Sequence, residues 1–500
     1  MTERAMSMNV LFDGMADMAS GNWPAVTDLC LDSRQVAPGA VFVALAGLQA
    51  HGLDFVEEAC RRGAVAVVHD GRGRAAERPD LPAPDVPTLV VPDLAKKLPE
   101  LAARMWGQLI GDMDLVAVTG TNGKTSVAWL LAQALDGAML GTLGCGRPDS
   151  YRPGELTTPD IFSVYRQLAA LAASGVKTVV IEASSHALDQ GRLAGLEFSS
   201  VIFTALGHDH LDYHGDRAAY GAAKMRLFTE FSSARWLVNL DDEFGRQIAA
   251  LPAAGQRLVG YSLDAGQGAA DSALRAAVVA RPRRIDMQGL VVEFETGGGL
   301  RFEAHSALLG RINIYNLLVV VAELGARRFK AACIADCLGR LVPVPGRMEP
   351  VGGGAQPLAI VDYAHTPDAL QKVLLSIREL TAGRLWCVFG CGGDRDRAKR
   401  PLMGRIAENL ADRVVLTDDN PRTEDGLGIV RAIQAGMAHP ERARVIRKRP
   451  DAIAFALQEC GAGDVVLIAG KGHETEQIVG NERLECDDRQ SARRALGVAA

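Results

Sequence analysis

Residues 116–126 read Val-Ala-Val-Thr-Gly-Thr-Asn-Gly-Lys-Thr-Ser, and this stretch decides the fold. An apolar run ends in a glycine-containing loop, and a helix-like segment follows. Glycines let the backbone approach phosphates, while the N–H groups of the loop and of the helix N-terminus hold anionic oxygens. Lys124 is placed to neutralise the β- and γ-phosphates of a nucleotide, and the Thr125 hydroxyl can ligate Mg²⁺. The pattern predicts a nucleotide-binding loop; a plain glycine turn is the alternative.

Apolar segments of strand length recur on both sides of this loop. Strand–helix alternation with nearly continuous apolar strands indicates a parallel sheet that is covered on both faces. The expected strands lie at 41–45, 64–68, 115–120, 178–183, 201–206, 236–241, 358–364, 385–390, 413–418 and 464–470. We therefore predict an α/β protein of three domains: a small N-terminal α/β domain at 1–95, a central P-loop-type parallel-sheet domain at 96–342, and a C-terminal Rossmann-like domain at 343–500.

The composition excludes several classes of protein. The 500 residues suffice for about three domains, and a net charge of −6 argues against nucleic-acid binding through a broad basic surface. The N-terminus lacks a secretory-signal pattern, and no apolar run reaches the roughly 20 residues that cross a bilayer. The nine scattered cysteines fit reduced thiols, and Cys387 and Cys391 lack a second pair at zinc-site spacing. We expect a cytoplasmic monomer that does not insert into membranes.

Polar clusters follow the ends of the expected strands. In the central block they are TNGKTS, SSH and HDHLDYH, and in the last block they are HTPD, GGDRDR, DNPR and KGHE. Open parallel sheets bind ligands at the edge where the carboxyl ends of the strands lie. We therefore expect the chemistry at two such edges that face each other across an interdomain cleft.

The loop departs from the general G-x-x-x-x-G-K-[ST] pattern, because Val118 stands where the first glycine would be. The shorter G-T-N-G-K-T loop resembles that of the Mur ligase family and of the folylpolyglutamate synthases, which activate a carboxylate as an acyl phosphate and then form an amide. The resemblance extends over essentially the whole chain. The ATP-binding residues that the loop and this resemblance imply are Gly120, Thr121, Asn122, Gly123, Lys124, Thr125, Ser126, Asn316, Arg347, Asp362 and His365.

A carboxylate and several histidines follow the next two strands. Glu182 ends a buried strand, where a lone carboxylate would be costly and a metal ion would make its burial favourable. The H-x-H pattern at 208–210 suggests zinc first, but a nearby nucleotide loop favours Mg²⁺, which prefers oxygen ligands and phosphates. By resemblance, the Mg²⁺ ligands are Thr125, Glu182, His210 and a modified Lys224, and the catalytic residues are Lys124, Lys224, Glu182 and His210.

Lys224 lies in a helix-like segment and, taken alone, reads as a surface lysine. The resemblance reverses this interpretation, because the matching lysine in Mur ligases is carbamylated by CO₂ to N6-carboxylysine. The carbamate is an oxygen-ligating anion that can bind a second Mg²⁺. One departure concerns Ala205, where relatives usually have asparagine, and it puts in doubt any polar contact from that position.

The resemblance is to members of the family that add meso-diaminopimelate to UDP-MurNAc-L-Ala-D-Glu. Arg422 offers a planar fork that can bind a carboxylate. Diaminopimelate has such a carboxylate at its distal end, whereas a lysine substrate lacks it. The residues matched to UDP-MurNAc-dipeptide binding are Leu31, Ser33, Leu48, Gln49, Ala50, Thr157, Thr158, Ser184, Gln190 and Arg192. Those matched to diaminopimelate binding are Arg395, Asp419, Asn420, Pro421, Arg422, Gly470 and Glu474.

The expected function is therefore ATP-dependent amide-bond formation in peptidoglycan precursor synthesis, with Mg²⁺ and with ATP as co-substrate. The N-terminal domain would bind the UDP-sugar, the central domain ATP, and the C-terminal domain the amino acid. Two enzyme alternatives are a lysine-adding member of the family and a folylpolyglutamate synthase; D-N-P-R and the UDP-like N-terminal segments argue against both. An alternative of another class is a nucleotide-binding regulatory protein with a decayed site.

Overall fold

The computed structural model describes residues 5–16, 18, 23–47, 50–71, 86–154, 156–207, 209–252, 255–263 and 277–498. The chain divides into two compact units. The first comprises Met1–Lys124, Leu135–Trp236 and Ala250–Leu258, and the second Thr125–Ala134, Leu237–Ala249 and Val259–Ala500. No helix within the described ranges is long and apolar enough to cross a membrane. All nine cysteines are free thiols, as the sequence predicts.

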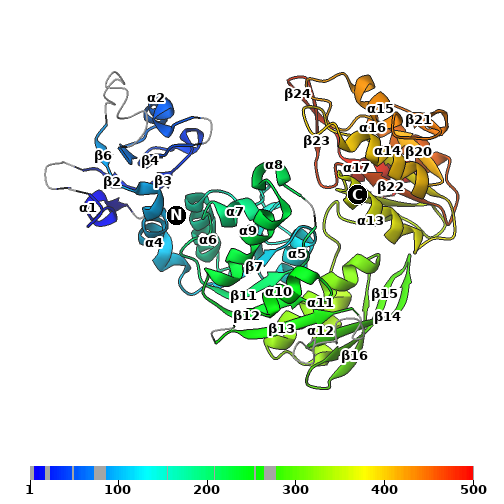
Figure 1. The fold of residues 1–500 in the computed structure, drawn as a ribbon, viewed down its shortest axis with the longest axis horizontal. Helices are drawn as coiled ribbons and strands as arrows, with labels where there is room; N and C mark the ends of the chain where they lie inside the picture. The colour runs from blue at the N-terminus through cyan, green and yellow to red at the C-terminus, as the bar shows by residue number, and fades with distance from the viewer. Residues whose placement is uncertain are drawn as a thin grey trace. The chain divides into compact units, whose positions relative to one another are not determined.

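The first unit begins with a small parallel sheet of order β3-β4-β5-β6 (Figure 1). The predicted strands at 41–45 and 64–68 are β4 and β5, and their side chains form an apolar core with Cys30 and Leu53. The elements are β1 (Met6–Ser7), α1 (Met8–Leu11), β2 (Ala25–Val26), β3 (Asp28–Cys30), η1 (Ser33–Gln35), β4 (Ala40–Ala44), η2 (Gly52–Phe55), α2 (Val56–Arg61), β5 (Ala66–His69) and β6 (Thr88–Val90).

The rest of the first unit contains a second sheet, in which β12-β11-β7-β10-β8-β9 are neighbours. β7 pairs in parallel with β10 and β11, and all five residues of β10 are buried, which explains their uninterrupted apolar run. The elements are α4 (Leu94–Ile110), β7 (Asp114–Thr119), β8 (Ala138–Gly141), β9 (Gly144–Gly146), α6 (Ile161–Ala173), β10 (Thr178–Glu182), α7 (Ser185–Asp189), β11 (Phe198–Phe203), α8 (Leu211–His214), α9 (Arg217–Thr229) and β12 (Ser233–Asn239).

The small sheet is fastened to helix α6 by one arginine. Arg166 donates from Nε to the Asp28 carboxylate at 2.9 Å and from one terminal nitrogen to the Leu29 carbonyl at 2.8 Å. The Ser163 hydroxyl adds a bond of 3.2 Å to the Gln35 side chain. Because Asp28 belongs to β3 and Gln35 to η1, these contacts fix the position of the segment that contains Ser33.

The second unit begins with helix α5 (Lys124–Ala134), which continues from the loop at the end of β7, and contains β-strands in the order β16-β15-β14-β13. β14, β15 and β16 pair antiparallel, an arrangement that the sequence analysis did not predict. Arginines on β14 face glutamates on β15, as in the 2.8 Å pair of Arg281 with Glu295. The further elements are α10 (Glu243–Ala249), β13 (Arg257–Ser262), β14 (Val278–Asp286), β15 (Gly289–Thr296), β16 (Arg301–Ser306), α11 (Arg311–Ala326) and α12 (Ala331–Arg340).

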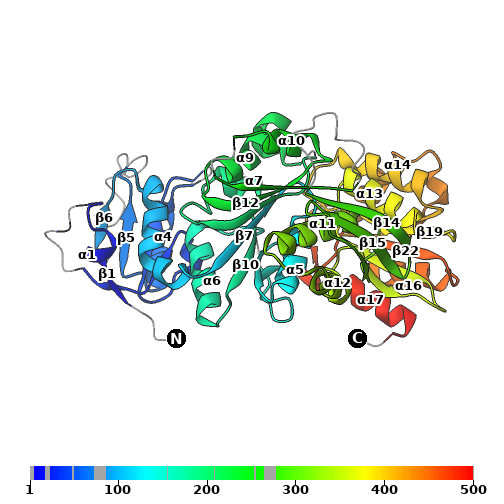
Figure 2. The same cartoon turned by 90° about the horizontal axis from the view of Figure 1, so that it is seen from below.

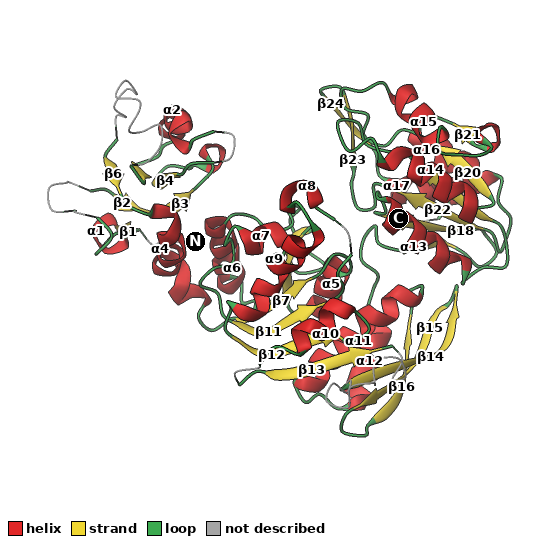
Figure 3. Cartoon of the chain, in the orientation of Figure 1, coloured by secondary structure: helices red, strands yellow, loops and turns green. Residues whose placement is uncertain are grey.

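The C-terminal part of the second unit is a doubly wound sheet of order β17-β18-β22-β19-β20-β21, with only β17 antiparallel to its neighbour. Helices α13, α14 and α15 cover one face, while α16 and α17 cover the other (Figures 2 and 3). The elements are β17 (Glu349–Gly352), β18 (Leu358–Asp362), α13 (Pro367–Arg378), β19 (Leu385–Phe389), α14 (Lys399–Leu410), β20 (Arg413–Leu416), α15 (Gly426–Gln434), η3 (Pro440–Arg442), β21 (Arg444–Val445), α16 (Arg449–Gln458), β22 (Val465–Ala469), β23 (Glu476–Val479), β24 (Glu482–Glu485) and α17 (Asp488–Leu496).

A buried ion pair joins the two helices on the second face of this sheet. Arg449 and Asp488 are both 0% exposed and form two hydrogen bonds of 2.7 Å, and the guanidinium also donates to the Ala469 carbonyl at 2.9 Å. We expect Asp488→Ala to destabilise the protein by about 3–5 kcal/mol, because it leaves a buried guanidinium without its counter-charge. Urea denaturation measures the effect. Asp451→Ala, which removes an exposed carboxylate of α16, is the control and should change stability by less than about 1 kcal/mol; equal losses would contradict the prediction.

Candidate active site

The predicted nucleotide loop lies between the end of β7 and the start of α5. Gly120 has φ +147° and Gly123 has φ +88°, and a Cβ at Gly120 would collide with the Thr204 hydroxyl. That hydroxyl donates to the carbonyls of Asn122 at 2.6 Å and Thr119 at 3.2 Å, so the residue directly after β11 supports the loop. Glycine is therefore required at 120 for a close approach of two strand ends, as the loop motif suggests.

Two lysine amines converge on this loop. Lys124 donates from Nζ to the Gly120 carbonyl at 2.8 Å, and Lys224 of α9 donates to the same oxygen at 2.9 Å. Lys224 is only 1% exposed, and its Nζ lies 4.4 Å from the centroid of the Tyr220 ring. Burial, reinforced by the charge of Lys124, holds the pKa of Lys224 well below the usual lysine value. The lowered pKa favours the neutral amine of Lys224, and an anion bound beside Lys124 would stabilise the positive charge at this loop.

Glu182 is fully buried at the end of β10. Its carboxylate accepts hydrogen bonds from the Thr142 backbone N–H at 2.8 Å and from the Thr142 hydroxyl at 3.2 Å. Gly141 leaves the space that this carboxylate occupies, because a Cβ at 141 would collide with Oε1. The residues after β8 thus hold Glu182 at the carboxyl edge of the sheet, where the sequence predicts it.

The residues matched to dipeptide binding form one hydrogen-bonded network beside Glu182. The Thr158 hydroxyl donates to the Glu182 carbonyl at 2.6 Å and to the Ser184 hydroxyl at 3.1 Å. Arg192 donates to the Thr158 carbonyl at 2.6 Å and to the Gln190 side chain at 2.7 Å. Thr157 lies within 3.0 Å of Thr142 through their hydroxyls. The structure thus brings together five polar side chains that the sequence places over 157–192.

His210 begins helix α8 with a left-handed backbone, φ 53°. Its ring meets His186 edge-on, with 4.8 Å between ring centroids, and its Nε2 lies 3.5 Å from the Asp209 carboxylate. Tyr220 lies 6.3 Å away between centroids and donates to the Thr121 hydroxyl at 3.1 Å. The helix is therefore connected to the nucleotide loop through aromatic contacts.

Only some of the N-terminal residues matched to UDP binding lie within the described residues. Leu48 and Gln49 lie outside the described residues. Ser33 is buried and donates to the Glu58 carboxylate at 2.7 Å, whereas Leu31 is half-buried and Ala50 is exposed. The bond to Glu58 gives a structural reason for a serine at position 33.

In the second unit, three residues matched to ATP binding gather around Tyr363. The Arg347 guanidinium carbon lies 4.4 Å above the Tyr363 ring, and the His365 ring lies 4.7 Å from it. Asp362 accepts from the backbone N–H groups of Met348 and Ala364, both at 2.8 Å, and burial raises its pKa. Asn316 instead donates to Asn313 within α11 at 2.8 Å.

The residues matched to diaminopimelate binding lie on neighbouring loops of the C-terminal sheet. Arg422 has φ 53° and donates to the Gly393 carbonyl at 2.8 Å, with its backbone bonded to Ile478 and Gly480. Asn420 donates to Glu474 at 3.1 Å. The remaining matches surround these: Pro421 and Asp419 precede Arg422, Gly470 approaches the Asp419 carboxylate, and the exposed Arg395 lies near Gly392.

Several residues of this site were not predicted from the sequence. They are Thr142, Thr204, Tyr220 and Tyr363, whereas Asp209, Lys471 and His473 lay within the predicted polar clusters HDHLDYH and KGHE without an assigned role. His473 stacks against Tyr363 with 5.2 Å between ring centroids, and burial lowers its pKa to about 4, so it is neutral near pH 7. Position directly after a strand is a signal that could have found Thr142, Thr204 and Tyr363, whereas Tyr220 on helix α9 is recognised only from its contacts.

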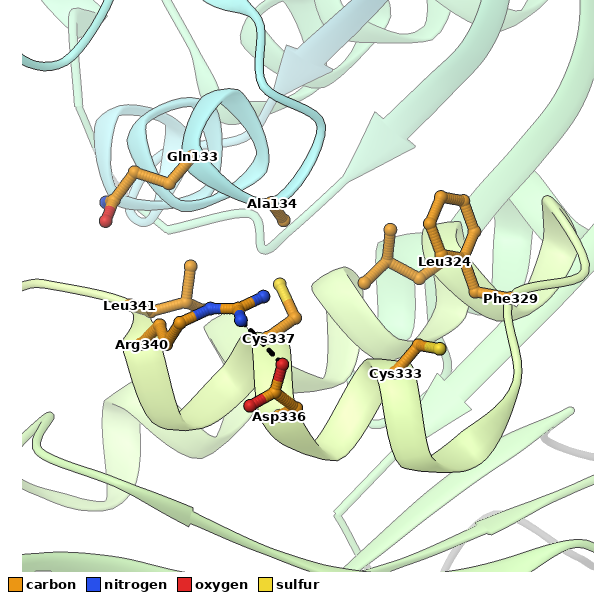
Figure 4. A pocket seen from close by; sticks show the side chains of 9 residues that line it. All are labelled: Gln133, Ala134, Leu324, Phe329, Cys333, Asp336, Cys337, Arg340 and Leu341. Carbon is orange, nitrogen blue, oxygen red and sulfur yellow. Dashed lines mark ion pairs between the residues drawn. The ribbon is translucent and has the colours of Figure 1, made fainter.

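A cavity of about 290 Å³ lies elsewhere in the second unit, between the ends of α5, α11 and α12 (Figure 4). It is lined by Gln133, Ala134, Leu324, Phe329, Cys333, Asp336, Cys337, Arg340 and Leu341. None of these is a predicted site residue, and Arg340 is already paired with Asp336 at 2.6 Å.

Within the described ranges, no three His, Cys, Asp or Glu side chains gather as a metal site. The predicted set of Mg²⁺ ligands contains only two residues of these types.

Comparisons with known proteins agree over the full chain. A relative from Alkalilimnicola ehrlichii, named UDP-N-acetylmuramoyl-L-alanyl-D-glutamate–2,6-diaminopimelate ligase, is 46% identical and covers 98% of this chain and 99% of its own. A relative of the same name from Pseudomonas putida is 43% identical, with 95% of each covered. A solved structure of a ligase so named has a TM-score of 0.68 at 34% identity, covering 99% of both chains. MurF ligase from Thermotoga maritima in complex with ADP shares the fold, with a TM-score of 0.61 at 19% identity, covering 88% of this chain and 93% of its own.

Fold and site together define a multidomain α/β protein with a glycine-containing loop at the carboxyl edge of a parallel sheet. Three family models match: Mur ligase family, catalytic domain, at 25–106; Mur ligase middle domain at 118–324; and Mur ligase, glutamate ligase domain, at 346–472. The chain belongs to the Mur ligase family. This membership confirms the fold class and the resemblance drawn from the G-T-N-G-K-T loop.

Proposed function

We propose that this protein is an ATP-dependent ligase that adds meso-2,6-diaminopimelate to UDP-MurNAc-L-Ala-D-Glu in peptidoglycan precursor synthesis. The observation that carries the proposal is the pair of lysine amines on the Gly120 carbonyl, 2.8 Å and 2.9 Å away, at the end of a phosphate-binding loop. Such a concentration of positive charge suits the terminal phosphates of ATP. The names of the full-length relatives support the choice of the other two substrates.

The reaction has two steps. An oxygen of the D-Glu γ-carboxylate attacks the γ-phosphorus of ATP, which gives an acyl phosphate and releases ADP. An amine of diaminopimelate then attacks the acyl carbon; the amide bond forms, inorganic phosphate leaves, and the proton of the amine passes to solvent. The protein contributes chiefly by positioning the reactants and screening their charges.

Lys124 and the N–H groups of residues 120–126 bind the phosphates, and Arg347, Asp362, His365 and Asn316 bind the remainder of ATP. The network of Thr157, Thr158, Ser184, Gln190 and Arg192 binds the muramoyl dipeptide, with Leu31, Ser33, Leu48, Gln49 and Ala50 on the UDP. ATP and a UDP-linked substrate are soluble, so the reaction takes place in the cytoplasm. The protein acts as a monomer, because one chain carries every group that the reaction needs.

The donor set fits Mg²⁺ on one condition. Thr125, Glu182 and His210 offer oxygen and nitrogen donors, whereas the ammonium of Lys224 cannot ligate a cation. Carbamylation of Lys224 would convert this buried cation into an oxygen donor, and it would remove the repulsion from Lys124. The bound Mg²⁺ would neutralise phosphate and carboxylate charge during phosphoryl transfer.

Selectivity for diaminopimelate arises at the loops after the C-terminal strands. Arg422 pairs with the distal carboxylate, while Glu474 receives the ammonium beside it. Asp419, Asn420, Pro421, Arg395 and Gly470 shape the surrounding pocket. A lysine substrate lacks the distal carboxylate and would leave Arg422 unpaired, which disfavours a lysine-adding enzyme. A folylpolyglutamate synthase has no use for the UDP-binding segment.

The product mass distinguishes these functions. Incubation with ATP, Mg²⁺, UDP-MurNAc-L-Ala-D-Glu and each of diaminopimelate, lysine and glutamate should give one new amide only with diaminopimelate, with one ADP and one phosphate per product. A larger yield with lysine or glutamate would overturn the choice of amino acid. ATP binding without turnover under any combination would support a regulatory protein instead.

A further inference from the structure

Lys471 is a fully buried cation in the loop after β22. Its side chain is 0% exposed, a rare state for lysine because removing an ammonium from water is costly unless partners compensate it. Lys471 has no role in the reaction proposed above. Because burying the Lys471 ammonium costs free energy, its position beside the candidate amino-acid pocket must be explained by the partners that it binds there.

The partners of Lys471 are two residues of that pocket. Its Nζ donates to the Asn420 side-chain oxygen at 3.1 Å and to the Glu474 carboxylate at 3.1 Å. Asn420 closes the triangle by donating from Nδ2 to the same Glu474 oxygen, also at 3.1 Å. Each of the three side chains is thus bonded to the other two.

The orientation of the Asn420 amide follows from its donors. Its Oδ1 accepts from Lys471 and from the Ile478 backbone N–H at 3.0 Å, and a backbone N–H can only donate. The amide must therefore turn Nδ2 toward Glu474. Lys471 helps to fix both the direction of this amide and the position of the carboxylate, which remains 34% exposed toward the pocket.

The backbone on both sides holds Lys471 in place. Gly470 has φ +120°, and a Cβ there would lie 2.5 Å from the Asp419 carboxylate. Gly472 has φ +53°, and a Cβ there would lie 2.7 Å from both the Gly346 carbonyl and the Tyr363 Cβ. The two glycines allow the loop to pack against its neighbours, so the Lys471 amine has little freedom to leave the triangle.

We propose that Lys471 is a specificity-determining positioning residue for the incoming amino acid. It acts through Glu474 and Asn420, whose orientation lets the carboxylate receive the distal ammonium of a diamino-dicarboxylic acid while Arg422 receives the adjacent carboxylate. This role rests on the proposed function. The hydrogen-bond partners of Lys471 are two residues matched to the amino acid, so its loss affects binding of the amino acid rather than that of ATP.

Lys471→Met tests the role because methionine keeps the length and apolar stem but removes the charge and the donors. The KM for diaminopimelate should rise about tenfold or more. The KM values for ATP and UDP-MurNAc-L-Ala-D-Glu should stay within about twofold. The ratio of kcat/KM for diaminopimelate to that for lysine should fall. Lys372→Met, which removes an exposed lysine paired with Asp368 in the same domain, is the matched control and should leave all three KM values unchanged.

A double variant distinguishes a role of Lys471 in positioning Glu474 from a general role in stabilising the structure. In Glu474→Gln, the same Lys471→Met change should alter the KM for diaminopimelate by less than about threefold, since its main target is gone. If the methionine variant does not fold, Lys471→Gln serves in its place: it removes the charge but keeps a polar group at this buried position, so it should give a smaller rise that is still confined to the KM for diaminopimelate.

An unchanged KM for diaminopimelate in folded Lys471→Met or Lys471→Gln would overturn the inference, as would equal rises for all three substrates. These outcomes leave the proposed function intact, because the unmodified protein still turns over. Absence of diaminopimelate turnover in the unmodified protein would overturn the proposed function together with this role.

Discussion

Lys224→Met is expected to lower kcat by about a thousandfold or more, the size of effect seen when a charge-stabilising group of phosphoryl transfer is lost. The lysine is buried at the nucleotide loop, with its amine 2.9 Å from the Gly120 carbonyl and 4.4 Å from the Tyr220 ring centroid. Methionine fills the same space without a polar group. The variant should therefore fold at least as stably as the unmodified protein, since it no longer buries an ammonium.

Steady-state phosphate release measures the loss, and Lys177→Met, at an exposed position of the same unit, is the control. The carbamate itself is tested with ¹³C-labelled bicarbonate: a carbamate carbon signal should appear in the unmodified protein and be absent from Lys224→Met. A fall in kcat of less than tenfold would contradict an essential role for Lys224. A full loss of activity without any carbamate signal would keep the lysine but reject its modification.

The sequence predicted where the loop at 120–126 and Glu182 lie in the fold, because both positions depend on local rules. A glycine loop after a buried strand leads to a helix N-terminus, and a polar residue at a strand end in a parallel sheet lies at the ligand-binding edge. Resemblance alone singled out Lys224 from a helix in which it reads as a surface residue. The structure supplies the reason, because α9 turns Lys224 inward to the Gly120 carbonyl.

Other parts of the site depend on contacts that no local pattern contains. Lys471 and Asn420 are 51 residues apart in sequence and meet only because β20 and β22 end at the same edge of the sheet. The β23–β24 hairpin that holds the Arg422 backbone has no strong apolar pattern, because β24 is exposed and mostly charged and β23 is only half-buried at its two central residues. In the antiparallel β14–β16 segment, β15 and β16 contain short alternations of apolar and charged residues, at 292–295 and 301–304, and this strand signal was not used in the prediction.

Arg422→Ala is expected to raise the KM for diaminopimelate by about a hundredfold, because it leaves a substrate carboxylate unpaired in a partly desolvated pocket. The arginine is well placed for this contact. Its backbone is fixed by the hairpin through bonds of 3.0 Å to Ile478 and 2.7 Å to Gly480, and its side chain is steadied by the Gly393 carbonyl at 2.8 Å. Alanine meets the same left-handed backbone, φ 53°, as the arginine does, so the substitution adds little strain.

Arg422→Lys separates charge from shape in this pocket. Lysine keeps the positive charge but lacks the planar fork that binds a carboxylate with two parallel hydrogen bonds, so its KM for diaminopimelate should lie between those of the unmodified protein and Arg422→Ala. Arg413→Ala, at the exposed start of β20, is the control. In both variants the KM for ATP should change less than about twofold, because the proposed role of Arg422 is confined to the amino acid. If diaminopimelate bound Arg422→Ala as tightly as the unmodified protein, the distal carboxylate would have to bind elsewhere, and the D-N-P-R loop would lose its assigned role in choosing the amino acid.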